Sequence, residues 1–276
     1  MQSTHEPTRS TPHNKGSESE EGLRELALFA GVGGSILGGK LCGWDPVCAV
    51  EYDAFRIGIL LARQNDGSLP PFPVWDDVRT FDGVPWRGTV DVVSAGFPCQ
   101  DIASGSSTRT GLAGERSGLY SEVIRIAGEV RSPYIILENS PLITKRGLEN
   151  VLGDLAGLGY DAEWGMFRAD WVGANHRRKR WFLVASDPNQ VGLQGGDDKC
   201  NDARRKKAER LSSLLATSPF PKLPDDLPAP WVYGVGNGAP HWVDAVAACG
   251  DAQVPAVVRL AWHTLLHRSA MPIEQR

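Results

Sequence analysis

A cysteine with nucleophilic potential lies in the run Gly96-Phe97-Pro98-Cys99-Gln100, directly after the apolar stretch VDVVSA. The thiolate of a cysteine is a strong nucleophile, and Pro98 restricts the backbone of the turn that carries it. The residues that follow, DIASGSSTRTGLAGERSG, are rich in Gly and Ser, so we expect a loop that can close over a substrate. The pattern favours covalent catalysis by Cys99, and a buried structural cysteine is the alternative.

Two further patterns are a carboxylate after an apolar run and a basic cluster before another. Glu138-Asn139-Ser140 follows the apolar run YIIL, where burial would favour a protonated carboxyl that donates a proton; an acid that caps the next turn is the alternative. The run HRRKR, residues 176–180, precedes WFLVA. In an extended chain Arg178 and Arg180 share one face, from which an arginine can bind a base, a phosphate or a carboxylate. A solvated basic edge is the alternative.

A glycine-rich turn, residues 29–34 with the sequence FAGVGG, follows the apolar run ELALF and precedes a helical pattern. Glycines at such a turn let a ligand approach the backbone, and a helix start offers free N–H groups. Glu51, at the end of the next apolar run, is placed to accept hydrogen bonds from ribose hydroxyls. The spacing differs from the dinucleotide fingerprint G-x-G-x-x-G, so an ordinary tight turn remains open for this pattern alone.

The elements that position these residues alternate along the chain. Apolar, strand-like runs at ELALF, PVCAVEYD, VDVVSAGFP, YIILEN and RWFLVAS are separated by helical patterns at SILGGKL, DAFRIGILLARQN, SGLYSEVIRIAGEV and TKRGLENVLGDLAGLG. This alternation predicts an α/β fold with a doubly wound, mostly parallel sheet that is covered on both faces. It stops after Ser186, and a polar, Gly- and Pro-broken segment follows before a last amphipathic helix.

Composition excludes several protein classes. The chain has 276 residues, of which 41% are hydrophobic and 22% charged, so a wholly disordered chain is excluded. No apolar run approaches the roughly 20 residues of a membrane span, and the first residues lack an apolar signal region. Five cysteines without a C-x-x-C pair argue against a disulfide scaffold and a cysteine zinc site. We therefore expect a cytoplasmic protein without a membrane partner.

The net charge of -4 at first disfavours a nucleic-acid partner, but the distribution of charge favours one. Residues 1–22, which we expect to be a disordered polar tail, carry two basic and four acidic residues. Positive charge is concentrated in residues 177–180 and again in ARRKKAER, residues 203–210. Phosphate binding depends on such local clusters more than on the total charge.

Taken in order, these motifs resemble those of the C5-cytosine DNA methyltransferases, from Leu26 to Ala185 and from Gly250 to the last helix. FAGVGG resembles the family's S-adenosylmethionine loop, PCQ its catalytic-cysteine motif, ENS its glutamate motif and HRRKR its Q-x-R-x-R motif. GDAQVP resembles the late G-N-x-V-x-P motif. The resemblance implies a Rossmann-like S-adenosylmethionine-dependent methyltransferase fold with a small inserted target-recognition domain. It implies a catalytic domain at 23–186, a recognition region at 187–240, and a C-terminal segment at 241–276 that returns to the catalytic domain.

The resemblance also implies a mechanism on a cytosine flipped out of duplex DNA. Cys99 would add to C6 of the base, Glu138 would donate a proton to N3, Arg178 would bind O2, and Asn139 would support Glu138 or the cysteine turn. The methyl donor would be S-adenosylmethionine, the product S-adenosylhomocysteine, and no metal is needed. Cofactor contacts are implied for Phe29, Ala30, Gly31, Val32, Gly33, Glu51, Tyr52, Asp77, Val78, Gly96, Pro98, Leu119, Asp251 and Gln253. Nucleic-acid contacts are implied for Gln100, Ser104, Arg109, Arg180, Arg204 and Arg205.

The sequence departs from the family in four ways. His176 replaces the usual glutamine, and Asp251 replaces the usual asparagine. The recognition region is short, and it has no clear version of the family's R-x-L-x-x-x-E-x-x-R-L-Q motif. Since Cys99, Glu138 and Arg178 are all present, we predict an active, monomeric DNA (cytosine-5-)-methyltransferase. The alternatives are an RNA (tRNA) cytosine-5 methyltransferase and a catalytically weak or vestigial DNA-binding relative. A nicotinamide-dependent oxidoreductase fits least well, because the glycine spacing is wrong and PCQ and EN would be unexplained.

Overall fold

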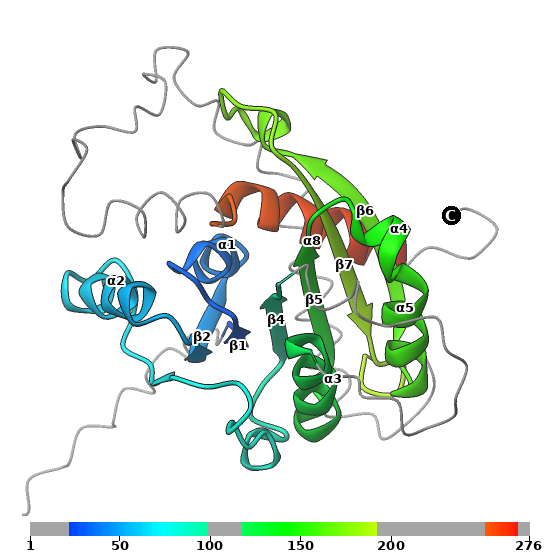
Figure 1. Cartoon of the computed structure of the whole chain (residues 1–276), viewed down its shortest axis with the longest axis horizontal. Coiled ribbons are helices and arrows are strands. Elements are labelled where there is room, and N and C mark those ends of the chain that lie inside the picture. The colour runs from blue at the N-terminus through cyan, green and yellow to red at the C-terminus, as the bar shows by residue number, and fades with distance from the viewer. Residues whose placement is uncertain (1–21, 99–117, 192–251, 270–276) are drawn as a thin grey trace, which may run out of the picture.

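The computed structural model describes residues 22–98, 118–191 and 252–269, and these form a seven-stranded sheet with helices on both faces (Figure 1). The strands are β1 (Leu23–Leu28), β2 (Trp44–Val50), β3 (Val74–Trp75), β4 (Val92–Gly96), β5 (Tyr134–Asn139), β6 (Asp161–Arg168) and β7 (Lys179–Ser186). The helices are α1 (Gly34–Leu41), α2 (Ala54–Asn65), α3 (Leu119–Val130), α4 (Ile143–Arg146), α5 (Leu148–Gly157) and α8 (Pro255–Ser269), with 3-10 turns η1 (Val84–Trp86) and η3 (Ala169–Val172). None of the helices in these ranges is long and apolar enough to cross a membrane.

The strand order is β3-β2-β1-β4-β5-β7-β6. Strands β1 to β5 pair in parallel, and β7 runs antiparallel to both β5 and β6. The order reverses between β1 and β4, and ligands bind open α/β sheets at the carboxyl ends of the strands beside such a reversal. The doubly wound, mostly parallel sheet predicted from the sequence is confirmed.

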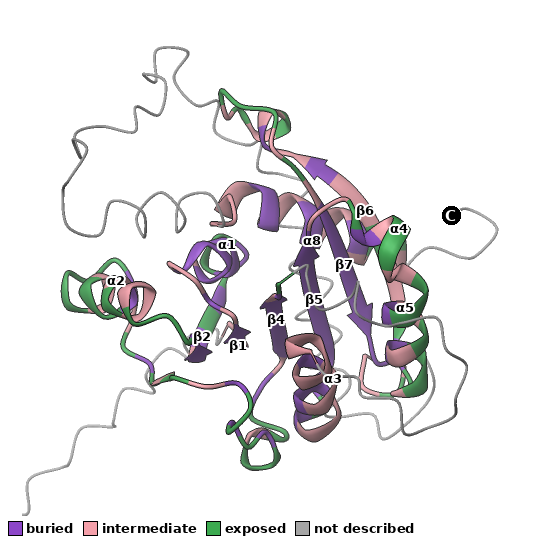
Figure 2. Cartoon of the chain, viewed as in Figure 1, coloured by how far each residue is buried: buried purple, intermediate pink, exposed green. Residues whose placement is uncertain are grey.

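Alternate residues of each central strand enter opposite cores, as a period of two requires. Leu26 and Leu28 on β1 pack with α3 and α5, whereas Ala27 between them packs with α1 and α2. Ile136 on β5 packs with α8. Figure 2 shows the consequence: the central strands β4, β5 and β7 are mostly buried, and the outward surface of α2 is exposed.

Helix α8 packs against α1 because α1 carries small residues at the contact. A Cβ atom on Gly38 would lie 2.5 Å from Val258 Cβ, and one on Gly39 would lie 2.6 Å from Trp44. Trp262 of α8 makes an edge-to-face contact with Trp44, with ring centroids 4.8 Å apart. Helix α8 therefore packs against the first helix and the second strand of the sheet.

The sequence patterns predicted most elements within a few residues and missed one long strand. The region TKRGLENVLGDLAGLG forms two helices, α4 and α5, that are separated at Gly147. No strand was predicted where β6 lies. Most of its residues are only partly buried or exposed, so the segment lacks the continuous apolar run of the central strands.

Candidate functional site

The glycine-rich turn and Glu51 come together at the carboxyl ends of β1 and β2. Gly31 and Gly33 adopt φ of 56° and 85°, a region that glycine enters without steric cost, and Gly33 precedes the first turn of α1. The buried carboxylate of Glu51 accepts hydrogen bonds from Gly31 N (2.7 Å) and Asp53 N (3.0 Å). Glu51 therefore fixes the turn and holds a carboxylate beside it.

Next to Glu51, two aromatic side chains and an acid lie on the surface. Tyr52 is 74% exposed, and the guanidinium of Arg79 lies 5.8 Å from the centre of its ring. The same guanidinium donates to both carboxylate oxygens of Asp77, which holds the pKa of that carboxyl below its usual range. Trp75, which is 46% exposed, donates from Nε1 to Thr80 Oγ1.

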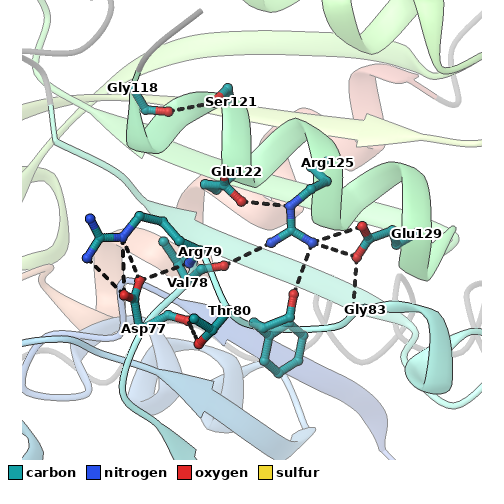
Figure 3. A network of polar contacts seen from close by, with 11 residues as sticks. Asp77, Val78, Arg79, Thr80, Gly83, Gly118, Ser121, Glu122, Arg125 and Glu129 are labelled. Carbon is teal, nitrogen blue, oxygen red and sulfur yellow. Dashed lines mark hydrogen bonds and ion pairs between the residues drawn. The ribbon is translucent and has the colours of Figure 1, made fainter.

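Arg125 of α3 attaches the loop that carries Asp77 to the rest of the fold (Figure 3). Its Nη2 donates to Val78 O at 2.9 Å and its Nη1 to Phe81 O at 3.0 Å. Glu122 and Glu129 flank the guanidinium at 2.7 and 2.8 Å, and Glu129 also accepts from Gly83 N at 2.9 Å. The sequence predicted this helix but not the role of its arginine.

The turn that leads to Cys99 is held from β5. The side-chain amide of Asn139 donates to Phe97 O at 3.0 Å, and its Oδ1 accepts from Ser140 N at 2.7 Å. Phe97 is buried, and its ring lies 5.1 Å from that of Tyr120, a second contact that the sequence did not suggest. Pro98 is the last residue before the gap in the description, and it is exposed.

Glu138 lies one strand away from Gly96, with which it pairs across β4 and β5. Its carboxyl is buried, and Arg180 Nε lies 3.0 Å from Oε1. The side-chain amide of Gln253 donates to Oε2 at 3.4 Å. A buried carboxyl that faces two donors at the carboxyl edge of the sheet is suited to contact a polar substrate.

The ladder between β5 and β7 explains why Arg180 reaches Glu138. Asn139 pairs with Trp181, so Arg180 lies just beyond the end of β5. Arg178 lies two residues farther along, which is roughly 7 Å in an extended chain. Both arginines are half-buried while Arg177 and Lys179 are exposed, which agrees with the predicted alternation of faces.

Several predicted site residues lie outside the described ranges: Cys99, Gln100, Ser104, Arg109, Arg204, Arg205 and Asp251. Those that the structure describes at the glycine turn, after β2 and β3, and around Glu138 all lie at the carboxyl edge of the parallel strands. Leu119 begins α3 and is partly buried against the core that contains Phe97. The site thus combines segments that are far apart in the sequence.

Two cysteines lie within the described ranges, and neither is suited to nucleophilic attack. Cys42 and Cys48 are buried and free. Burial raises the pKa of both thiols, to about 11 for Cys48 and higher still for Cys42. Since the thiolate is the reactive form, both side chains are unreactive at neutral pH.

Comparison with known proteins gives a consistent result. The family described as C-5 cytosine-specific DNA methylase matches residues 23–224. Type II methyltransferase M.CviJI of Paramecium bursaria Chlorella virus IL3A is 34% identical over 164 residues, which are 59% of this chain and 43% of that protein. Type II methyltransferase M2.BsuMI of Bacillus subtilis is 28% identical over 180 residues, or 61% of this chain and 44% of that protein.

A solved structure described as a candidate DNA modification methyltransferase encoded within an E. coli prophage has a TM-score of 0.50 and 25% identity. The match covers 64% of this chain and 49% of that one. The match thus spans less than half the length of these two curated relatives, and about half of this structure.

Proposed function

The chain belongs to the C-5 cytosine-specific DNA methylase family, and we propose that it transfers a methyl group from S-adenosylmethionine to C5 of a cytosine in duplex DNA. The proposal rests on one observation: the residues expected to act on the base and those expected to bind the cofactor lie at one edge of the sheet. The buried carboxyl of Glu138, with Arg180 beside it, lies next to Gly96, which begins the turn to Cys99. Glu51 and the glycine turn lie at the same edge of the sheet, on the other side of the point between β1 and β4 where the strand order reverses.

The residues after β1, β2 and β3 fit S-adenosylmethionine. A Cβ on Gly31 would have no atom within 4 Å, so the backbone of this turn faces open space. The Glu51 carboxylate has lone pairs left for ribose hydroxyls, Tyr52 offers an exposed ring to an adenine, and Asp77 offers a carboxylate to its amino group. The remaining contacts in our proposal are those expected of Phe29, Ala30, Val32, Gly33, Val78, Gly96, Pro98, Leu119, Asp251 and Gln253. When bound, S-adenosylmethionine supplies the methyl group that C5 receives.

We assign the nucleophile to Cys99, which follows directly on the turn that Asn139 holds through Phe97 O. Its sulfur would form a bond to C6, and the ring electrons would shift to make C5 nucleophilic. After C5 is methylated, a solvent water would take the C5 proton and the S–C6 bond would break. The proton leaves to water and the electron pair of the S–C6 bond returns to sulfur, so the thiolate is regenerated.

We assign the stabilisation of the ring to Glu138 and Arg180. Protonated Glu138 would donate to N3, where negative charge develops during addition to C6. The sequence led us to expect Arg178 at O2 of the cytosine. Because Arg180 Nε lies 3.0 Å from Glu138 Oε1, we propose Arg180 for this contact. For Arg178 we propose a contact with a phosphate.

The remaining parts of the proposal concern DNA and the cell. Duplex DNA would contact Gln100, Ser104 and Arg109, and residues 187–240 with Arg204 and Arg205 would recognise the target. We also propose a monomer that acts in the cytoplasm. The local concentration of positive charge at residues 177–180 supports binding of phosphates beside the site.

Transfer of labelled methyl groups tests the proposal. The protein is incubated with labelled S-adenosylmethionine and either mixed-sequence duplex DNA or tRNA, alongside Cys99→Ser and Glu138→Gln. We expect label in DNA with the wild type and with Cys48→Ala, a matched control at a buried cysteine. Cys99→Ser should abolish transfer, and Glu138→Gln should lower it by roughly 100-fold or more. Label in tRNA alone, or in neither substrate, would overturn the proposal.

A further inference from the structure

Gln253, in the segment that leads into α8, occupies a space created by two glycines. A Cβ on Gly34 would lie 2.4 Å from the carbonyl oxygen of Gln253 and 3.0 Å from its nitrogen. A Cβ on Gly96 would lie 2.5 Å from Gln253 Nε2. Contacts under 3.0 Å are too short for a real Cβ, so any side chain at either position would displace Gln253. The absence of a side chain at Gly34, after the glycine turn, and at Gly96, at the end of β4, therefore leaves the space that Gln253 fills.

The side chain of Gln253 is directed at Glu138. Its Nε2 lies 3.4 Å from Glu138 Oε2, while Arg180 Nε lies 3.0 Å from Oε1. Each carboxyl oxygen thus faces a different donor, one from β7 and one from the segment before α8. Two donors on opposite oxygens define the plane of the carboxyl group, which a flexible glutamate side chain would otherwise not keep.

The amide group suits a carboxyl that binds and releases a proton. A glutamine amide can donate to a carboxylate and also to a protonated carboxyl, because the protonated form keeps acceptor capacity and its own proton stays available for N3. A lysine or arginine at this position would also donate, but it would add positive charge that opposes protonation of the acid. Gln253 is therefore able to orient Glu138 in both protonation states.

We propose that Gln253 is a positioning residue that orients the Glu138 carboxyl toward the target base, in addition to any contact with the cofactor. This role rests on the proposed function, because it concerns the group that would act on the cytosine. It makes the C-terminal segment part of the catalytic apparatus.

The variant Gln253→Met tests the proposal, since methionine has a similar length and no polar hydrogen. Gln190→Met is the matched control, because Gln190 Nε2 bonds Asp187 and the Arg131 carbonyl at the opposite edge of the sheet. We expect Gln253→Met to slow single-turnover methylation by roughly 10- to 100-fold, as loss of a supporting hydrogen bond typically does. Affinity for S-adenosylhomocysteine, measured by calorimetry, reports any loss of cofactor contact separately, and the rate should fall by a larger factor than this affinity does. Gln190→Met should change neither quantity.

A double-mutant cycle separates positioning of Glu138 from a structural effect. In a Glu138→Gln background, Gln253→Met should have almost no further effect on the single-turnover rate. An equal fold-loss in both backgrounds, or a rate loss fully accounted for by weaker S-adenosylhomocysteine binding, would overturn the role.

A crystal structure of Gln253→Met gives a readout that does not depend on activity. We expect the Glu138 carboxyl in more than one orientation, whereas the wild type should show one. If the wild type methylates no DNA, the proposed function has failed, and a single unchanged orientation in the variant would independently refute the positioning role.

Discussion

Replacing Arg125 with alanine should weaken both the fold and the binding of the cofactor. The guanidinium makes two charged hydrogen bonds to backbone carbonyls, Val78 O and Phe81 O, at 2.9 and 3.0 Å. Bonds of this kind contribute about 1.5–3 kcal/mol each, but the side chain is one-third exposed, which places them at the low end. We therefore expect the free energy of unfolding to fall by about 2–3 kcal/mol and the melting temperature by about 5–10 °C.

The effect on the cofactor follows from the position of the loop. Without Arg125, Val78 O and Phe81 O lose their bonds to α3, while Gly83 N keeps its bond to Glu129, so the backbone next to Asp77 must be ordered when the ligand binds. We expect S-adenosylhomocysteine to bind about tenfold more weakly, equivalent to about 1.4 kcal/mol. Calorimetric titration of S-adenosylhomocysteine measures this affinity directly, and thermal unfolding measures the stability.

Arg24 offers a control of the same residue type and similar exposure. It donates to the Asp91 carboxylate and to Gly88 O, and it lies at the start of β1, at the opposite end of the strand from the site. Arg24→Ala should lower the melting temperature to a similar extent and leave S-adenosylhomocysteine affinity unchanged. Equal affinities for the wild type and Arg125→Ala, or equal losses in the two alanine variants, would refute the reasoning.

Two other predictions concern buried carboxyls. Glu51→Gln removes one of the oxygens that accept from Gly31 N and Asp53 N. The affinity for S-adenosylhomocysteine should therefore fall by roughly 10- to 100-fold. A calorimetric affinity within about twofold of the wild-type value would contradict the role of Glu51. Burial raises the pKa of Glu25 to about 7 although Ser94 donates to it. Because the folded pKa is raised, wild-type stability should decline between pH of about 4.5 and 7, by roughly 3 kcal/mol at most. Glu25→Gln should remove this decline in urea unfolding across that range, and a parallel pH dependence in both proteins would argue against it.

The fold was largely predictable because its central strands are buried on both faces. Runs such as YIIL and WFLVA are continuous and apolar, so they identify β5 and β7 directly. Within the part of the chain that the structure describes, strand β6 pairs with β7 alone, and its sequence DAEWGMFR mixes acids, glycine and aromatics. Its formation depends on the β7 ladder more than on its own composition, so no local pattern could have identified it.

The site was predictable where neighbouring strand ends bring motifs together, and not where helices supply distant contacts. Glu51 and the glycine turn follow adjacent parallel strands, so their proximity is a consequence of the topology. Arg125 lies 47 residues from Val78, and nothing in either segment specifies that they meet. The contact between Arg180 and Glu138 could not be predicted either. Arg178 and Arg180 lie on the same face of the chain, and the register of β5 with β7 decides which of them lies beside Glu138.

Two segments that are far apart in the sequence supply side-chain contacts to the Glu138 carboxyl. Arg180 precedes Trp181 on β7, and Gln253 follows directly on the region between 192 and 251. Gly34 and Gly38 of α1 contact Gln253 and Val258, so the last segment is attached to the first helix itself. The position of the Glu138 carboxyl thus depends on two residues that lie 73 positions apart in the sequence, and on the packing of the last helix against the first.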